Sequence, residues 1–150
     1  MTLSVDMQVC VKAWAPRRAD IANWASLAVG RRARGKELGV RIVGTAESRR
    51  LNARYRGRDR ATNVLSFPAP TLPDGPGQPL GDLVICAAVL RGEAREQGKS
   101  LKAHWAHLVV HGALHLIGYD HEHAAEASRM ERREVAVLRR LGFSNPYRSS

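Results

Sequence analysis

Apolar residues recur at every second position in two stretches of the first half of the chain, residues 3–9 and 38–42. This alternation is typical of β-strands that bury one face. The stretches TNVLSFP (62–68) and LGDLVIC (80–86) are rich in branched and aromatic side chains, and they predict a third and a fourth strand. Pro68 ends the third strand, because proline lacks the backbone donor that a strand interior needs.

Helical periodicity fills the intervals between the first three strands. Pro16 can open a helix whose apolar face includes Trp24. Thr45 can cap a short helix that runs to about Tyr55 and that Gly57 ends.

Three further helices are expected after the fourth strand. The first ends near Gly98, the second is capped by Ser100 and stops at Gly118 after about Ile117, and the third runs from about Glu122 to Leu141 before Gly142. Residues 68–79, rich in proline and glycine, are predicted to form a loop.

The predicted element order is β-α-β-α-β-β-α-α-α. It favours an α+β fold in which a small mixed four-stranded sheet is packed with about five helices. The helices are expected to cover one face of the sheet, or unequal parts of both faces. A chain of 150 residues is expected to form one domain over residues 1–150.

Charge narrows the range of partners. The formal net charge of +10 at pH 7 favours a polyanion, such as nucleic acid or an anionic membrane surface, although a biased genome composition alone can also enrich arginine. The chain contains no apolar stretch of about twenty residues, and residues 1–9 do not resemble a signal peptide, so a cytoplasmic protein is expected. Cys10 and Cys86 are interpreted as small buried apolar residues rather than a disulfide.

The stretch HGALHLIGYDH, residues 111–121, contains His111, His115 and His121. An α-helix advances about 100° per residue, so the first two rings lie roughly 40° apart and one turn along, and both can point at one ion. Gly118 can end the helix in a left-handed conformation and turn the chain, which would let His121 supply a third nitrogen. Three ligands leave one position open, as in catalytic zinc sites. A His-rich helix lining a metal cleft is therefore expected.

Two neighbouring features leave alternatives open. His107 and His111 form a rival pair four residues apart, but the set 111/115/121 is preferred because it includes the turn glycine. His107 is then expected to line the cleft, and His104 to be a polar neighbour. Asp120 either orients a ligand ring or a water molecule, or is a turn residue.

The histidine spacing also matches that of metzincin proteases, except at one position. Those enzymes place a general-base glutamate directly after the first histidine, where this chain has Gly112. The spacing favours a metal site, and the missing carboxylate argues against that protease mechanism.

HGALHLIGYDH resembles the signature of the YbeY family, which comprises bacterial endoribonucleases and ribosomal-RNA maturation factors. Three other stretches are similar to that family: AESRRLNARYRGRDRATNVLSFP (46–68), LGDLVIC (80–86) and KAHWAHLVVHG (102–112). The likeness is clear over residues 40–121 and weak at both ends.

The resemblance implies a single α+β domain with one zinc-type ion per chain, held by His111, His115 and His121. Three imidazoles also suit nickel or another divalent transition metal. It further implies that Arg56, in YRGRD, is an important arginine of the cleft. The implied activity is single-strand-specific RNA cleavage in ribosomal RNA maturation, including 16S rRNA 3′-end processing and ribosome quality control. The implied partners are RNA and the small ribosomal subunit with its proteins.

Phosphodiester cleavage builds negative charge on phosphoryl oxygens, which the forked guanidinium of Arg56 could meet. Arg58 and its neighbours Arg54 and Arg60 could follow the RNA backbone. Ser66 and Asn63 either touch substrate or cap the core, and Trp105 either stacks on a base or packs the helix. The spacing singles out no carboxylate as general base, so either a metal-bound hydroxide or the 2′-hydroxyl of the RNA is the nucleophile.

Two other functions remain open from the sequence. One is a metallopeptidase-like hydrolase, suggested by the histidine spacing. The other is a non-catalytic ribosome-assembly factor in which the metal only stabilises the turn at Gly118.

Overall fold

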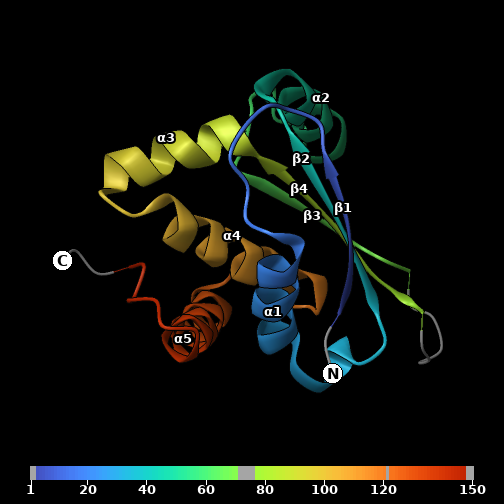
Figure 1. Ribbon diagram of the computed structural model, residues 1–150, viewed down its shortest axis with the longest axis vertical. Coiled ribbons are helices and arrows are strands. Elements are labelled where there is room, and N and C mark those ends of the chain that lie inside the picture. The colour runs from blue at the N-terminus through green and yellow to red at the C-terminus, as the bar shows by residue number, and fades with distance from the viewer. Residues whose placement is uncertain (1–2, 71–76, 121, 148–150) are drawn as a thin grey trace.

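Figure 1 shows the computed structural model, which describes residues 3–70, 77–120 and 122–147. Within these residues the chain forms a four-stranded sheet and five α-helices, in the predicted order. The strands are β1 (Ser4–Val9), β2 (Glu37–Val43), β3 (Val64–Pro68) and β4 (Pro79–Cys86). The helices are α1 (Arg18–Val29), α2 (Thr45–Arg56), α3 (Ala87–Gln97), α4 (Leu101–Leu116) and α5 (Ala124–Arg140), with a short 3-10 helix, η1 (Gly30–Ala33), after α1.

The sheet is mixed, as expected, and its strand order is β1-β2-β4-β3. β1, β2 and β4 are mutually parallel, and β3 is antiparallel to β4. Leu83 pairs with Val40 on one side and with Ser66 on the other. β4 therefore lies between the parallel strand β2 and the antiparallel edge strand β3, and it pairs with both.

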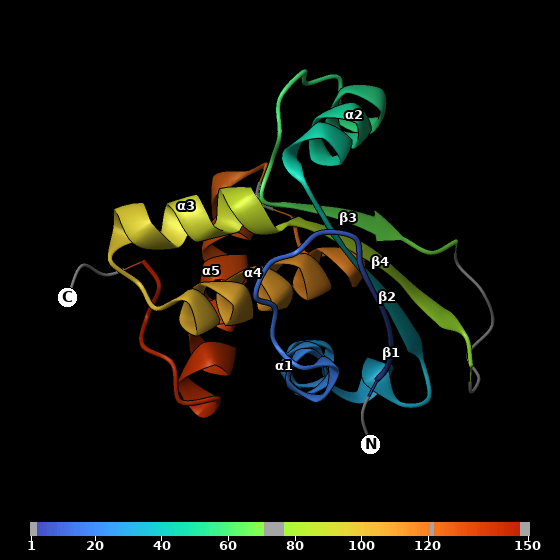
Figure 2. The same cartoon turned by 45° about the horizontal axis from the view of Figure 1, so that its top comes forward.

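The helices cover the two faces of the sheet unequally. In Figures 1 and 2, α1, α3, α4 and α5 gather on one side and α2 lies at one end of the other. The main core lies under the larger group of helices and includes the alternate residues Leu38, Val40, Ile42, Leu83 and Ile85. A smaller cluster of Val43, Leu65 and Val84 packs against Leu51 of α2 and Phe67. Strand alternation therefore divides the apolar residues between two layers.

Helix α4 is the central helix of the domain. It contacts β3 and β4 of the sheet and also the helices α1, α3 and α5. Ten of its sixteen residues are buried. The side chain of Ser100 caps its amino end by accepting a hydrogen bond from the Ala103 amide at 3.1 Å, as predicted. Trp105 is 1% exposed, so it packs in the core and does not present a stacking surface.

Two local expectations were wrong. Gly44 occupies the cap position of α2 in an extended conformation, and Thr45 is already the first helical residue. Cys10 is exposed because it follows the last residue of the edge strand β1, whereas Cys86 is buried as expected, and both are free thiols. Helix α5 begins at Ala124, close to the expected start near Glu122. None of the described helices is both long and apolar enough to span a membrane.

Candidate functional site

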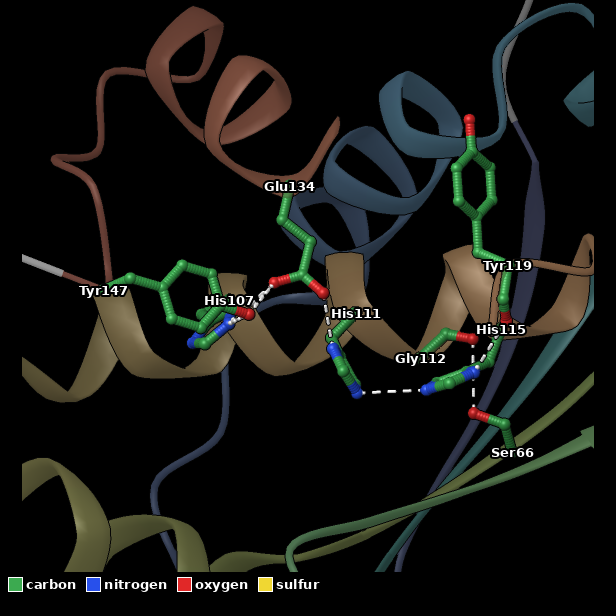
Figure 3. A network of polar contacts seen from close by, with 8 residues as sticks. All are labelled: Ser66, His107, His111, Gly112, His115, Tyr119, Glu134 and Tyr147. Carbon is green, nitrogen blue, oxygen red and sulfur yellow. Dashed lines mark hydrogen bonds and ion pairs between the residues drawn. The ribbon is translucent and has the colours of Figure 1, made fainter. Parts of the chain in front are cut away.

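Helix α4 brings His111 and His115 side by side, as the spacing predicted. Their ring centroids are 4.6 Å apart, and the two Nε2 atoms face each other at 3.1 Å (Figure 3). Both side chains are partly exposed on a helix that is otherwise mostly buried. The pair therefore lies at an edge of the core, where a ligand can reach it.

The other nitrogen of each ring is held by an oxygen acceptor. Nδ1 of His115 lies 2.9 Å from the carbonyl oxygen of Tyr119, and Nδ1 of His111 lies 2.5 Å from Oε1 of Glu134. Since a carbonyl and a carboxylate accept but do not donate, both Nδ1 atoms carry the proton. In the neutral rings both Nε2 atoms are then lone-pair acceptors that face each other.

This arrangement fits a shared metal ion. Two nitrogen ligands of a tetrahedral zinc, each about 2.0–2.1 Å from the ion, are separated by roughly 3.3 Å. The observed 3.1 Å between the two Nε2 atoms is close to that separation. Metal-bound histidines also commonly donate their other N–H to a carboxylate or a backbone carbonyl, as these two do. The third predicted ligand, His121, lies outside the described residues.

A second group of ligand atoms lies on the opposite side of His111. One atom each of His107, His111 and Glu134 fall within 4.8 Å of one another. However, Nδ1 of His111 and Oε1 of Glu134 are 2.5 Å apart, which is a hydrogen-bond distance and shorter than the separation of two ligands on one zinc. We therefore interpret this group as a hydrogen-bond network that supports His111.

Glu134 is the centre of that network and is fully buried. Its Oε2 accepts hydrogen bonds from Nε2 of His107 at 3.1 Å and from the hydroxyl of Tyr147. Burial alone would raise the pKa of this carboxyl group, but the hydrogen bonds from His107, His111 and Tyr147 hold it at about 2. Burial and the same carboxylate raise the pKa of the Tyr147 hydroxyl. Glu134 is therefore ionised at neutral pH.

A cleft of about 600 Å³ opens in front of the histidine pair. It is lined by side chains of α2, the loop after α2, β3, α4 and the turn after α4: Asn52, Arg56, Arg58, Arg60, Thr62, Asn63, Val64, Leu65, Ser66, Pro68, His111, His115, Asp120 and Glu122. The predicted residues Arg56, Arg58, Ser66 and Asp120 thus share one cavity with His111 and His115. The arginines make the part of the cleft lined by α2 and the loop after it basic.

Arg56 is positioned by the end of α2 and by β3. Gly57 adopts a left-handed conformation (φ 69°) and ends the helix, as predicted, immediately after Arg56. One guanidinium nitrogen, Nη2, donates to the backbone carbonyl of Ser66 at 3.0 Å. The side chain is otherwise exposed, so the remaining donors of its fork are accessible from the cleft.

The arginine-rich loop after α2 is held by two buried polar side chains of that helix. Nδ2 of Asn52 donates to the carbonyl of Arg60 at 2.9 Å. Oγ of Ser48 accepts from the amide of Thr62 at 2.9 Å and donates to its carbonyl at 3.0 Å. The loop is therefore fixed to the helix, and Arg58 and Arg60 line the cleft.

Gly112 faces the sheet rather than the cleft. A side chain there would begin 2.8 Å from a methyl carbon of Leu83, and the Gly112 carbonyl accepts a hydrogen bond from Oγ of Ser66 at 3.2 Å. Metzincin proteases carry the catalytic glutamate at this position, whereas here the glycine allows α4 to pack closely against the sheet. Ser66 both lines the cleft and joins β3 to α4.

The remaining candidate residues have structural partners. Oδ1 of Asp120 accepts from the amide of Glu122 at 3.0 Å, as a turn residue does, while its side chain lines the cleft. His107 is absent from the cleft lining in the described part of the chain and contacts Glu134 instead. His104 is buried against Glu93 at 2.9 Å, and burial lowers its pKa. Asn63 lines the cleft and its Nδ2 donates to the same Glu93 carboxylate.

Sequence reasoning missed Glu134 and Tyr147. A signal was present for the first, since Glu134 falls on the apolar stripe of α5, between the buried residues Met130 and Val137. A charged residue on a core-facing stripe requires a partner. Tyr147 follows the last helix and carried no such pattern.

Comparison with known proteins agrees with this architecture. The family model described as endoribonuclease YbeY matches residues 10–142, most of the chain. The solution structure of TM1509 from Thermotoga maritima, a structural genomics target, has a similar fold. It is 23% identical in sequence, with a TM-score of 0.54, over 91% of this chain and 92% of that one.

Proposed function

Because the chain belongs to the YbeY family of endoribonucleases, we propose that it is a metal-dependent endoribonuclease that cleaves single-stranded regions of ribosomal RNA. The observation that carries the proposal is the composition of one cavity. The cleft of about 600 Å³ contains both the paired Nε2 atoms of His111 and His115 and the exposed guanidinium of Arg56. A metal site and an anion-binding group that line the same cleft suit metal-assisted phosphodiester cleavage.

His111, His115 and His121 would hold one zinc ion per chain, and nickel or another divalent transition metal would suit the same imidazoles. When bound, the ion supplies Lewis-acid polarisation of a phosphoryl oxygen and a water of lowered pKa. Because the carbonyl of Tyr119 and the carboxylate of Glu134 bind the Nδ1–H groups, Nε2 is the atom through which each of these two histidines would hold the ion.

Arg56 would bind the phosphate group undergoing cleavage. Its contact with the Ser66 carbonyl uses one donor and orients the guanidinium, so the other N–H groups can bind two phosphoryl oxygens. The negative charge on these oxygens grows toward the transition state, so the bond strengthens where it lowers the barrier. Arg58 and Arg60 would bind neighbouring phosphates along the cleft.

The geometry disfavours the metallopeptidase alternative. That mechanism needs a carboxylate at position 112, where this chain has glycine, and a Cβ there would lie 2.8 Å from a methyl carbon of Leu83, so a glutamate would require the packing between α4 and the sheet to shift. The carboxylate nearest the histidine pair, Glu134, is hydrogen-bonded on the buried side of His111.

For the cellular role we propose maturation of ribosomal RNA, including processing of the 16S rRNA 3′ end and ribosome quality control, in the cytoplasm. The partners would be the small ribosomal subunit and its associated proteins. The support for this role is membership of the family and the net charge of +10, which suits a polyanionic particle.

Elemental analysis combined with an RNA-cleavage assay tests the proposal. Three histidine ligands hold one ion, so purified wild-type protein is expected to contain about one zinc equivalent per chain. It is also expected to cleave a single-stranded ribosomal RNA precursor. His111→Ala should lose both the metal and the activity while remaining folded by circular dichroism. If the protein binds metal but cleaves none of the ribosomal RNA precursors, the result would instead support a role as a non-catalytic assembly factor.

A further inference from the structure

The buried side of His111 contains a carboxylate that packing alone does not explain. Glu134 is 0% exposed and lies on the stripe of α5 that packs into the core. Burying a carboxylate is costly unless its oxygens are fully hydrogen-bonded, and a Leu or Met would satisfy the same stripe without that cost. The hydrogen bonds of Glu134 therefore indicate why a carboxylate occupies this position.

The hydrogen-bond partners of Glu134 are two histidines of α4 and Tyr147, which follows α5. Oε1 lies 2.5 Å from Nδ1 of His111, and Oε2 accepts from Nε2 of His107 at 3.1 Å and from the hydroxyl of Tyr147. Figure 3 shows the carboxylate between the two histidines, with the tyrosine ring approaching from the opposite side to His115. His107 and Tyr147 are themselves 3.3 Å apart, so the carboxylate is held from one side and contacts the metal-site histidine on the other.

We propose that Glu134 is a positioning residue of the metal site: its carboxylate fixes the tautomer and direction of the His111 ring, and His107 and Tyr147 fix the carboxylate. This inference rests on the proposed function, since it requires His111 to be a metal ligand. A carboxylate on Nδ1–H also makes Nε2 a stronger donor to a metal. Nδ1 of His115 contacts a backbone carbonyl, whereas Nδ1 of His111 contacts a side chain, so a substitution at Glu134 can change the metal affinity without removing a ligand.

The test compares metal affinity in wild-type protein with that in Glu134→Gln. Glutamine keeps the size of the side chain but removes the charge, and metal affinity is expected to fall about 10- to 100-fold. Affinity for Zn²⁺ is measured by competition with a chromophoric chelator, and Co²⁺ replaces zinc for an absorption spectrum that reports the ligand field. Val137→Ala is the matched control, because Val137 is buried on the same helix. It should lower the melting temperature while leaving metal affinity within about twofold of wild type.

The outcomes separate this proposal from the proposed function. If Glu134→Gln binds Zn²⁺ as tightly as wild type, Glu134 is structural only and the inference is wrong, while the metal site stands. If wild-type protein binds no metal, or His111→Ala loses none, the proposed function itself fails. Two ions per chain, one of them lost in both His107→Ala and Glu134→Gln, would make Glu134 a ligand and would also overturn the positioning role.

A measurement on wild-type protein covers the case in which Glu134→Gln does not fold. Long-range ¹⁵N–¹H correlation spectra distinguish the two tautomers of a histidine ring. Metal-free protein is expected to show His111 with its proton on Nδ1 and none on Nε2. A spectrum with the proton on Nε2 would overturn the proposal, because the carboxylate would then not be setting the tautomer.

Discussion

Replacing Arg56 by alanine tests whether this side chain acts on the substrate or only on the fold. In the structure it makes one hydrogen bond, from Nη2 to the Ser66 carbonyl at 3.0 Å, and it is otherwise exposed. Loss of such a bond should cost about 1 kcal/mol of unfolding free energy at most. For a domain of this size that corresponds to a fall of roughly 2–4 °C in melting temperature.

The expected effect on cleavage is much larger. Removing one pre-positioned donor from a developing oxyanion typically costs about 10²–10³ in rate, and a factor of 100 corresponds to about 2.7 kcal/mol of lost transition-state stabilisation. Because the charge on the phosphoryl oxygens increases during the reaction, kcat should fall more than KM rises. The assay is multiple-turnover cleavage of a fluorescently labelled single-stranded RNA, with zinc content and melting temperature measured on the same samples.

Arg54→Ala is the matched control. It removes the same charge from the same turn of α2, but Arg54 lies over the Tyr55 ring, 5.3 Å from its centre, and is outside the cleft lining among the described residues. Its cleavage rate should stay within about threefold of wild type because Arg54 does not line the cleft among the described residues, while loss of the exposed cation–π contact should cost about 0.5–1 kcal/mol of stability. If both alanine variants cleave at the same rate, Arg56 has no special role in the reaction.

Three further predictions follow from other parts of the site. Metal removal by a chelator should lower the melting temperature of wild-type protein and added Zn²⁺ should restore it, with no such shift in His115→Ala, as measured by differential scanning fluorimetry. Ser48→Ala leaves the amide and carbonyl of Thr62 without their buried partner, and should cost about 2 kcal/mol in urea unfolding; an unchanged midpoint would mean that the loop is not held there. The binding constant for single-stranded RNA falls as the salt concentration rises, and Arg58→Ala and Arg60→Ala should each reduce the magnitude of this log–log slope by about 0.7. An unchanged slope would exclude a phosphate contact.

Local regularities in the sequence determined much of this protein. Strand alternation and helix periodicity depend on neighbouring residues, so they predicted the element order, but they left open whether the helices cover one face of the sheet or unequal parts of both. The four-residue spacing of His111 and His115 similarly predicted two adjacent rings on one helix. The sequence also predicted the end of α2 at Gly57 and the Ser100 cap, because each depends on the conformation of a few consecutive residues.

The tertiary structure alone decided which distant residues meet. Arg56 shares a cleft with the histidines because antiparallel β3 runs beside β4 and under α4, a pairing that no local pattern encodes. Glu134 and Tyr147 reach His111 and His107 only because α5 folds back against α4. Such contacts arise from the packing of whole elements, where the gain from burying apolar surface selects the arrangement and polar groups must then find partners within it.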